Sequence, residues 1–428
     1  MNTQTYSPGE TTTAVATVAV IGLGYIGLPT AAILAGKGLH VIGVDVNPYT
    51  VEAVNEGRVP FVEPDLGIHV AGAVSQGHLV AQSTTPQADA YIVAVPTPFR
   101  EDKTADLVYV EQAARKIAPQ IQPGNLVILE STSPPGTTQR MADVILALRP
   151  DLAAEANDGE ATVLFAHCPE RVLPGRIMIE LVMNDRIIGG LTPEAATAAA
   201  ALYSTFCQGG IHLTDAATAE MAKLVENAYR DVNIAFANEL SVISSNLGID
   251  VWNLIELANH HPRVNILQPG PGVGGHCIAV DPWFIVSADP ENSRLIRTAR
   301  EVNDAKPDHV VAAVESAMAG HESPTIAALG LAFKANVDDM RESPAVEIVR
   351  RLADSNPGAR IVVGSPFSES DLPEDLAAFG NVSLTGTDAA VDAADVVVLL
   401  VDHDAFREIT PEQLAGKKIV DTRGFWRA

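Results

Sequence analysis

One stretch of the chain, residues 268–284 (QPGPGVGGHCIAVDPWF), holds the residue types that covalent catalysis needs. Glycines at this density let a backbone approach a ligand closely and adopt positive φ angles. Cys277 follows this loop, where its thiol could meet the reacting carbon of a ligand. Asp281 comes four residues later, one turn away on the same face if a helix begins here. The alternative is a tight turn before a buried and inert cysteine. The remaining motifs of the chain decide between a catalytic and a structural cysteine.

A dinucleotide-binding pattern lies near the N-terminus. An apolar run at residues 15–23 predicts a buried parallel strand, an Ala-rich helix follows at 28–36, and a second strand at 40–44 ends at Asp45. Between the first strand and the helix stands the motif Gly22-Leu-Gly24-Tyr25-Ile26-Gly27. In this context Gly22 makes the tight turn, Gly24 admits a pyrophosphate and Gly27 lets the helix pack on the strand. Asp45 would bond the ribose hydroxyls and repel a 2′-phosphate, which favours NAD over NADP.

Strands and helices continue to alternate after this motif. Residues 90–95, 125–130, 163–166 and 186–188 read as strands, and residues 110–121 read as a helix. Polar residues stand at the strand ends, namely Thr97, Thr132 and the run 167–171 (HCPER). Because the carboxyl ends of parallel strands line the ligand crevice of an open sheet, these residues predict a binding site.

A long helix is predicted over residues 218–247, which contain no glycine or proline and carry apolar residues at helical spacing. At about 45 Å it would connect two domains and could support a dimer. Lys223, Asn227 and Arg230 share one face of this helix. They could bind a polar, anionic ligand, although such a polar stripe can also be a solvated face.

The paired histidines His260 and His261 do not predict a metal site, because no carboxylate or further histidine stands nearby at ligand spacing.

A second α/β pattern begins after Pro324, with strands predicted at 325–332, 359–364, 396–401 and 418–420. Ser343 is expected to cap a helix that has Pro344 at its first position. This unit has no glycine fingerprint, but Lys334 and Arg423 stand at strand ends, where they could bind the phosphates of a second nucleotide.

The predicted architecture is therefore α/β, with two Rossmann-like, doubly wound parallel-sheet domains joined by a long central helix. Residues 1–14 are polar and are expected to form a disordered tail rather than a signal peptide. The domain boundaries follow the motifs, with an NAD-binding domain at 15–212, a central helical dimerisation domain at 213–320 and a second nucleotide-binding domain at 321–428.

Charge and cysteine usage narrow the functional classes. The formal net charge of −25 argues against nucleic acid as a partner, so any phosphate site must be built locally. No apolar run reaches the length of a membrane span. Three scattered cysteines make neither a disulfide framework nor a zinc site, which is typical of a reducing cytosol and predicts a cytoplasmic protein.

A cysteine beside an NAD site indicates a particular reaction. An alcohol gives up hydride directly, whereas an aldehyde has a hydride to give only after a nucleophile adds to its carbonyl. A thiolate that adds there forms a thiohemiacetal, the second oxidation gives a thioester, and water releases the acid. NAD, a thiol and a base can therefore take an alcohol to an acid in two oxidations.

The residues from Val15 to Trp426 resemble the UDP-glucose/GDP-mannose dehydrogenase family of nucleotide-sugar 6-dehydrogenases. The strings GPGVGGHCIAVDPWF, CPERVLPG, KLVENAYRDVNIAFANEL and HPRVNILQPG carry the resemblance. It implies oxidation at C6 of a UDP-sugar by NAD, in cell-surface polysaccharide synthesis, by a homodimer or higher homo-oligomer. Within the family, these strings favour N-acetylmannosamine as the sugar, with N-acetylglucosamine or glucose as alternatives. The Gly-His-Cys at 275–277 differs from the segment of the members that act on UDP-glucose.

The resemblance also implies roles for single residues. Cys277 would be the nucleophile, Lys223 and Asn227 would stabilise the oxyanion, and Asp281 would position or deprotonate the thiol or a water. Glu170 and Thr132 would serve thioester hydrolysis. The acid–base roles of Lys223, Asp281 and Glu170 stay open.

Binding roles follow in the same way. The glycine motif with Tyr25 and Ile26, together with Asp45, Thr97, Thr132 and Arg341, would hold NAD. The substrate would be bound by Arg171, Val172, Leu173, Lys223, Asn227, Arg230, His261, Arg263, Gly274, Phe333, Lys334 and Arg423. Arg230 and Arg341 could instead form structural ion pairs.

Two readings compete with a four-electron dehydrogenase. A catalytically silent NAD-binding scaffold would not need Cys277, Lys223 and Asp281. A two-electron hydroxyacid dehydrogenase would need neither the cysteine loop nor a second nucleotide domain.

Overall fold

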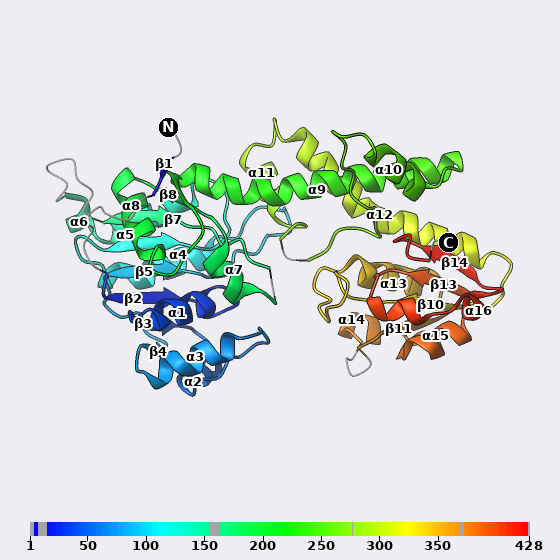
Figure 1. Cartoon of the computed structure of the whole chain (residues 1–428), viewed down its shortest axis with the longest axis horizontal. Coiled ribbons are helices and arrows are strands. Elements are labelled where there is room, and N and C mark those ends of the chain that lie inside the picture. The colour runs from blue at the N-terminus through cyan, green and yellow to red at the C-terminus, as the bar shows by residue number, and fades with distance from the viewer. Residues whose placement is uncertain are drawn as a thin grey trace. The chain divides into compact units, whose positions relative to one another are not determined.

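The computed structural model describes residues 4–6, 15–154, 163–173, 175–275, 277–367 and 372–426. The chain divides into two compact units, Met1–Glu226 and Asn227–Ala428. Each unit contains a sheet of its own, and the long helix α9 (Ala216–Leu247) links them (Figure 1). The predicted fold class is thereby confirmed.

The first unit is built on a sheet with the order β1-β9-β8-β7-β6-β5-β2-β3-β4 among the described residues. Its strands are β1 (Gln4–Thr5), β2 (Thr17–Ile21), β3 (His40–Val44), β4 (Leu79–Gln82), β5 (Ala90–Val93), β6 (Leu126–Leu129), β7 (Leu164–His167), β8 (Arg186–Gly190) and β9 (Ile211–Asp215). The part from β4 to β7 is the doubly wound order, which reverses between β2 and β5. A dinucleotide binds at such a reversal, so the order places the cofactor site beyond the ends of β2 and β5.

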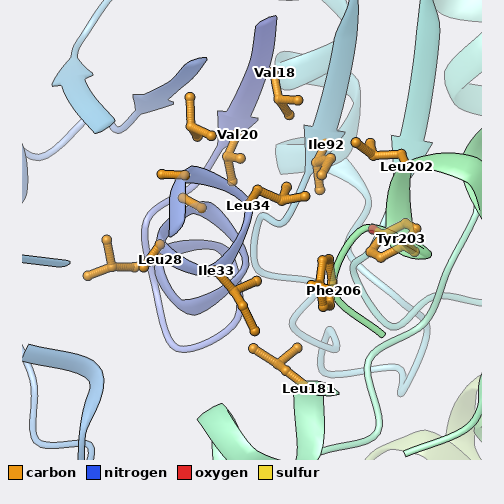
Figure 2. Close-up of a cluster of buried hydrophobic side chains, with 14 of the residues drawn as sticks. Val18, Val20, Leu28, Ile33, Leu34, Ile92, Leu181, Leu202, Tyr203 and Phe206 are labelled. Carbon is orange, nitrogen blue, oxygen red and sulfur yellow. The ribbon is translucent and has the colours of Figure 1, made fainter. Parts of the chain in front are cut away.

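Helices cover both faces of this sheet. They are α1 (Gly27–Gly36), α2 (Pro48–Asn55), α3 (Leu66–Ser75), α4 (Val108–Ile117), the 3-10 helix η1 (Ala118–Gln120), α5 (Thr137–Leu148), α6 (Pro150–Ala154), α7 (Ile177–Met183) and α8 (Pro193–Tyr203). Strand side chains alternate between the two cores, so Val18 and Val20 join α1 on one face while Ala19 and Ile21 join α4 and α5 on the other. Figure 2 shows the first core, in which Leu34 of α1 lies under the strands that carry Val20 and Ile92.

Two details of the first unit differ from the prediction. Residues 4–6 are ordered rather than part of a disordered tail, because β1 pairs antiparallel with β9 and the Tyr6 N–H donates to the Ile211 carbonyl. The rest of residues 1–14 lies outside the described residues. The sheet is also not wholly parallel, because β8 runs antiparallel to β7. Antiparallel neighbours need no crossover over a face of the sheet, and the link from β7 to β8 contains only the short helix α7.

The helices of the second unit include the long helix α12 (Arg294–Met318), which the sequence analysis missed. They are the C-terminal part of α9, α10 (Val251–Asn259), α11 (Asp281–Ala288), α12 (Arg294–Met318), α13 (Pro344–Ser355), α14 (Glu374–Ala377), α15 (Thr387–Ala393), the 3-10 helix η2 (Asp404–Glu408) and α16 (Pro411–Leu414). Helix α12 escaped prediction because it is rich in charged residues and holds Pro307 in its interior. At α13, Ser343 accepts from the Ala345 N–H with Pro344 at the first position, as predicted.

The second sheet repeats the doubly wound order as β12-β11-β10-β13-β14, with all its pairs parallel. Its strands are β10 (Thr325–Leu329), β11 (Arg360–Gly364), β12 (Val382–Thr385), β13 (Val396–Leu399) and β14 (Lys418–Asp421). The reversal between β10 and β13 marks a second nucleotide-type crevice, although no glycine fingerprint follows β10.

Candidate active site

The glycine motif forms the tight turn between β2 and α1. A Cβ atom at Gly27 would lie 1.9 Å from the Gly22 carbonyl oxygen, and one at Gly22 would lie 2.5 Å from the Ala94 carbonyl oxygen. Gly22 also has a φ of +96°, which favours glycine. A Cβ at Gly24 would meet nothing within 4 Å. Gly22 and Gly27 are thus required by packing, whereas the space at Gly24 is open to a ligand.

Asp45 closes this turn from the end of β3. Its carboxylate accepts the Leu23 N–H at 2.9 Å and the Asn47 N–H at 2.8 Å. Each oxygen keeps a further lone pair, which suits the two hydroxyls of an adenosine ribose. The open space at Gly24 and the acidic group at the second strand end therefore fit NAD.

The ends of β5 and β6 lie side by side in the same crevice. The Thr97 hydroxyl donates to the Thr132 carbonyl at 2.5 Å, and the Ser131 hydroxyl donates to the Val95 carbonyl at 2.7 Å. Tyr25 lies in the glycine turn and stacks on Phe61 with 4.2 Å between ring centroids. The hydrogen bond between Thr97 and Thr132 brings these two residues together, as expected for the ends of parallel strands at one edge of a sheet.

Two glutamates of α9 fasten the loops of the first unit around Lys223. Glu220 accepts the N–H groups of Gly136 and Thr138 at 2.6 and 2.7 Å, and so caps α5 directly after the Thr132 loop. Glu226 bonds the Arg171 guanidinium at 2.6 Å. Lys223 lies between these glutamates on α9 and is 9% exposed. The loops of Thr132 and Glu170 are thereby both tied to the turn of α9 that carries Lys223.

The Glu170 loop has its own fixed geometry. Glu170 is 8% exposed and accepts the Arg171 N–H at 2.7 Å and the Arg186 guanidinium at 3.1 Å. The Arg171 guanidinium contacts the Asp185 carbonyl as well as Glu226. These two contacts hold the Glu170 loop on α9. Val172 packs on the core, while the Leu173 side chain is exposed.

The second unit holds the thiol with its predicted neighbours. The Asp281 N–H donates to the Cys277 carbonyl at 2.9 Å, so Cys277 lies one turn before the start of α11. Asp281 is 3% exposed, and its carboxylate accepts the Asn227 amide of α9 at 2.5 Å. The Cys277 side chain is exposed, and none of the three cysteines, all within the described residues, forms a disulfide. The structure therefore joins Asn227, Asp281 and the backbone of Cys277.

The glycine loop before Cys277 packs on the second sheet domain. A Cβ at Gly274 would lie 2.4 Å from the Glu342 carbonyl oxygen and 3.1 Å from the Phe333 side chain, and one at Gly270 would lie 2.5 Å from the Arg423 guanidinium. Arg423 is held by Asp402 at 2.8 Å. The glycine loop thus lies against Arg423 at Gly270 and against Phe333 at Gly274, while Lys334 is exposed beside Phe333.

The remaining predicted residues are on the surface of the second unit. Arg341 forms an ion pair with Asp339 two residues away, which matches the structural alternative noted above. Arg230, His261 and Arg263 are exposed, the last two in the turn after α10. Within the described ranges, no group of three or more His, Cys, Asp or Glu side chains could hold a metal ion.

A buried hydrogen-bond chain that the sequence analysis missed supports the glycine loop. Asn238 of α9 accepts the Gly270 N–H at 2.9 Å and donates to Asn303 of α12 at 2.8 Å. Asn303 donates to the Asp231 carboxylate at 2.8 Å, and Asp231 forms an ion pair with Arg300. Asp231 and Arg300 are both fully buried. Polar residues on otherwise apolar helix faces were the signal that could have revealed them.

A second group was also missed, below the ends of β6 and β7. Glu130 and Arg186 are 1% and 4% exposed, although they flank strands whose other side chains are apolar. A charged residue at the end of an apolar strand was again the available signal.

Similar proteins identify the family. The chain matches the NAD-binding domain of the UDP-glucose/GDP-mannose dehydrogenase family at residues 16–207, its central domain at 217–305 and its UDP-binding domain at 327–428. An NDP-N-acetyl-D-galactosaminuronic acid dehydrogenase of Ralstonia nicotianae is 55% identical, with 96% of each chain covered. The UDP-N-acetyl-D-mannosamine dehydrogenase of Escherichia coli is 53% identical, with 96% of this chain and 99% of that protein covered.

Solved structures agree with the fold. The UDP-N-acetyl-mannosamine dehydrogenase of Staphylococcus aureus has a TM-score of 0.82 at 41% identity, and the alignment covers 96% of both chains. The UDP-D-ManNAc dehydrogenase of Pyrococcus horikoshii has a TM-score of 0.83 at 38% identity with the same coverage. The chain therefore belongs to the UDP-glucose/GDP-mannose dehydrogenase family, and it is an NAD-dependent oxidoreductase of nucleotide sugars.

Proposed function

We propose that this enzyme oxidises UDP-N-acetyl-D-mannosamine at C6 to UDP-N-acetyl-D-mannosaminuronate in two NAD-dependent oxidations. The observation that carries the proposal is the exposed Cys277 thiol, one turn before Asp281 and its bond to Asn227. An alcohol dehydrogenase has no use for this thiol, whereas the oxidation of an aldehyde to an acid requires a nucleophile.

The residues act in sequence. The C6 hydroxyl gives its proton to a base, for which Lys223 and Asp281 are the candidates, and the Cys277 thiolate then adds to the aldehyde carbon. Lys223 and Asn227 stabilise the oxyanion of the resulting thiohemiacetal. When bound, NAD accepts the hydride in each oxidation. Water, placed by Thr132 and deprotonated by Glu170, attacks the thioester, and the C–S bond breaks to release the uronate and the Cys277 thiolate.

Different residues bind the UDP part and the sugar part of the substrate. Gly274, Phe333, Lys334 and Arg423 hold the UDP part, because a cation, an aromatic ring and a glycine backbone gather there. Arg171, Val172 and Leu173 line the sugar, together with Arg230. His261 and Arg263 contact the substrate from the turn after α10, and Arg341 contacts NAD.

The choice of sugar rests on the relatives. Several UDP-N-acetyl-D-mannosamine dehydrogenases are 53–54% identical over 96% of this chain. The 55% identity to an NDP-N-acetyl-D-galactosaminuronic acid dehydrogenase supports a galacto-configured N-acetylhexosamine as the second candidate. Both sugars carry the N-acetyl group and would use the same chemistry.

We also infer a cytoplasmic homodimer that supplies cell-surface polysaccharide synthesis. Tyr229, Phe236, Ile243 and Leu247 repeat at intervals of seven, seven and four along α9, so they share one helix face, and all four are exposed. An exposed apolar stripe of this length supports association with a second copy. No described helix is both long enough and apolar enough to cross a bilayer.

The test is NADH absorbance and product mass after incubation with NAD and, separately, the UDP derivatives of N-acetylmannosamine, N-acetylgalactosamine, N-acetylglucosamine and glucose. Two NADH per UDP-N-acetylmannosamine, with little from the others, is expected. The same stoichiometry with another sugar would move the substrate assignment and keep the mechanism. One NADH with a released aldehyde would remove the thiol mechanism, and no NADH with any sugar would favour the non-catalytic scaffold.

Cys277→Ala should abolish acid formation. The matched control is Cys207→Ala, since Cys207 lies in the first unit, where its thiol contacts the carbonyl groups of Asn184 and Gly209. Normal uronate production by Cys277→Ala would refute the role of the thiol.

A further inference from the structure

A buried carboxyl cluster lies beneath the ends of β6 and β7. It consists of Glu130, Cys168, Glu170, Arg186 and Tyr203, whose exposed fractions are all 8% or less. Two carboxyl groups and one guanidinium therefore share one buried space. Only Glu170 of this cluster has a part in the chemistry proposed above, so the other members need an explanation.

Arg186 directs its charge at Glu170. One terminal nitrogen donates to the Glu170 carboxylate at 3.1 Å and to the Leu181 carbonyl at 3.2 Å, and the other lies 3.5 Å from the Cys168 sulfur. The guanidinium packs over the rings of Tyr203 and Phe206 at 4.7 and 5.1 Å. Figure 2 shows these two rings close together at the edge of the core. The aromatic rings and the carbonyl fix the guanidinium in one orientation, with Glu170 as its one carboxylate partner in the described chain.

Glu130 has different partners. Its carboxyl group bonds the Tyr203 hydroxyl at 3.0 Å and the Thr30 hydroxyl at 3.2 Å, and neither partner is a cation. Burial, followed by the charge of Glu170, raises the pKa of Glu130 to about 8, against the opposing effect of Arg186. The groups that face Glu130 are Thr30 from α1, Tyr203 from α8, Arg186 from β8, and Cys168 and Glu170 after β7. Arg186 is the one cation of this cluster. When Glu130 is neutral it does not compete with Glu170 for the ion pair with Arg186.

We propose that Arg186 is a positioning residue for the hydrolytic step, which holds the Glu170 carboxylate aimed at the water, and that Glu130 supports it by bonding Tyr203 and Thr30 instead of Arg186. The inference rests on the role proposed above for Glu170. In that step Glu170 takes a proton from water while the water oxygen bonds to the thioester carbon. The bond from that carbon to the Cys277 sulfur breaks, the thiolate leaves, and nothing is oxidised or reduced. A displaced Glu170 would stop the enzyme after both oxidations.

The first test is rapid-mixing NADH formation by Arg186→Met and Arg186→Lys, with intact-protein mass spectrometry. We expect a burst of two NADH per active site, then turnover about 10- to 100-fold slower than wild type, and an acyl adduct on Cys277. Arg186→Lys should show a smaller defect, because the charge remains but the fork geometry is lost. The matched control is Arg149→Lys, a half-buried arginine that bonds the Ala118 and Ile121 carbonyls and Asp151; it should give no burst and no adduct.

The second test uses Glu130→Gln, which imitates the neutral acid and keeps the shape of the side chain. Wild-type turnover should fall above pH 8, where Glu130 ionises and competes for Arg186, and this alkaline limb should be missing from Glu130→Gln. An identical limb in both proteins, or slow turnover of Arg186→Met without an adduct, would overturn the inference. Failure of wild type to make acid would instead refute the proposed function, so the two failures are distinguishable.

Discussion

Removing the Asp231 carboxylate should destabilise the second unit through a mechanism whose size can be worked out. Asp231→Ala leaves Arg300 buried, with Asp304, which is half exposed, as its remaining carboxylate partner. Breaking a buried ion pair from one side costs about 3–5 kcal/mol, and the remaining Asp304 places this case at the lower end. Asn303 also loses an acceptor, which adds about 1 kcal/mol. We therefore expect a loss of about 3–4 kcal/mol in the free energy of unfolding.

Calorimetry of the full chain should detect this loss. For a unit of this size, each kcal/mol lowers Tm by about 2–4 °C, so the transition of the second unit should move down by about 6–16 °C. Asp231→Asn keeps the shape and an acceptor and should lose about half as much. Turnover at 25 °C should also fall in Asp231→Ala, because Asn303 and Asn238 transmit the change to Gly270 and the cysteine loop.

A double-mutant cycle separates charge burial from simple loss of packing. Asp231→Leu combined with Arg300→Met replaces the pair by apolar side chains and should recover most of the stability lost by Asp231→Leu alone. A Tm change below about 2 °C for Asp231→Ala, or strictly additive losses in the double variant, would refute the reasoning.

Three further predictions follow from the described contacts. Gly27→Ala should prevent stable folding of the first unit, whereas Gly24→Ala should fold and raise the KM for NAD, as thermal unfolding and kinetics would show; equal behaviour of the two would contradict the geometry. Partial burial lowers the pKa of Lys306 to about 8, so below pH 8 the folded state holds a partly buried charge, and stability rises as pH increases from 8 to 10.5. Lys306→Met should therefore stabilise the protein at pH 7 by up to about 3 kcal/mol, with no gain at pH 10.5, and no gain at pH 7 would exclude the effect. Phe236→Glu should shift the proposed dimer toward monomer in light scattering, whereas Ile68→Glu at an exposed position of α3 should not. An unchanged mass for Phe236→Glu would refute association through the α9 stripe.

Local patterns predicted local structure well. The glycine motif, β3 and Asp45 were predictable because strand, turn and helix are encoded within 30 residues of continuous chain. The interval from Cys277 to Asp281 predicted one helical turn, and the bond between their backbones agrees. Ser343 and Pro344 likewise marked the start of α13.

The features that escaped prediction depend on distant residues. The direction of β8 is not encoded in its apolar alternation, which is the same for parallel and antiparallel neighbours. The bond between the Arg171 guanidinium and Glu226, which is 55 residues away, was not predicted either. Pairings of this kind arise only when the fold brings two charges together, so a single sequence carries no signal for them.

The position of Asp45 has a consequence for redesign of the coenzyme preference. The carboxylate that would repel a 2′-phosphate is also the acceptor that holds the Leu23 N–H in the glycine turn. An exchange of Asp45 for a small or basic residue would admit NADP and release this turn at the same time. A successful switch therefore needs an acceptor of equal reach at position 45, such as asparagine, with the new cation placed on a neighbouring residue. One side chain, Asp45, therefore sets both the coenzyme preference and the stability of the glycine turn, so a substitution that changes one also changes the other.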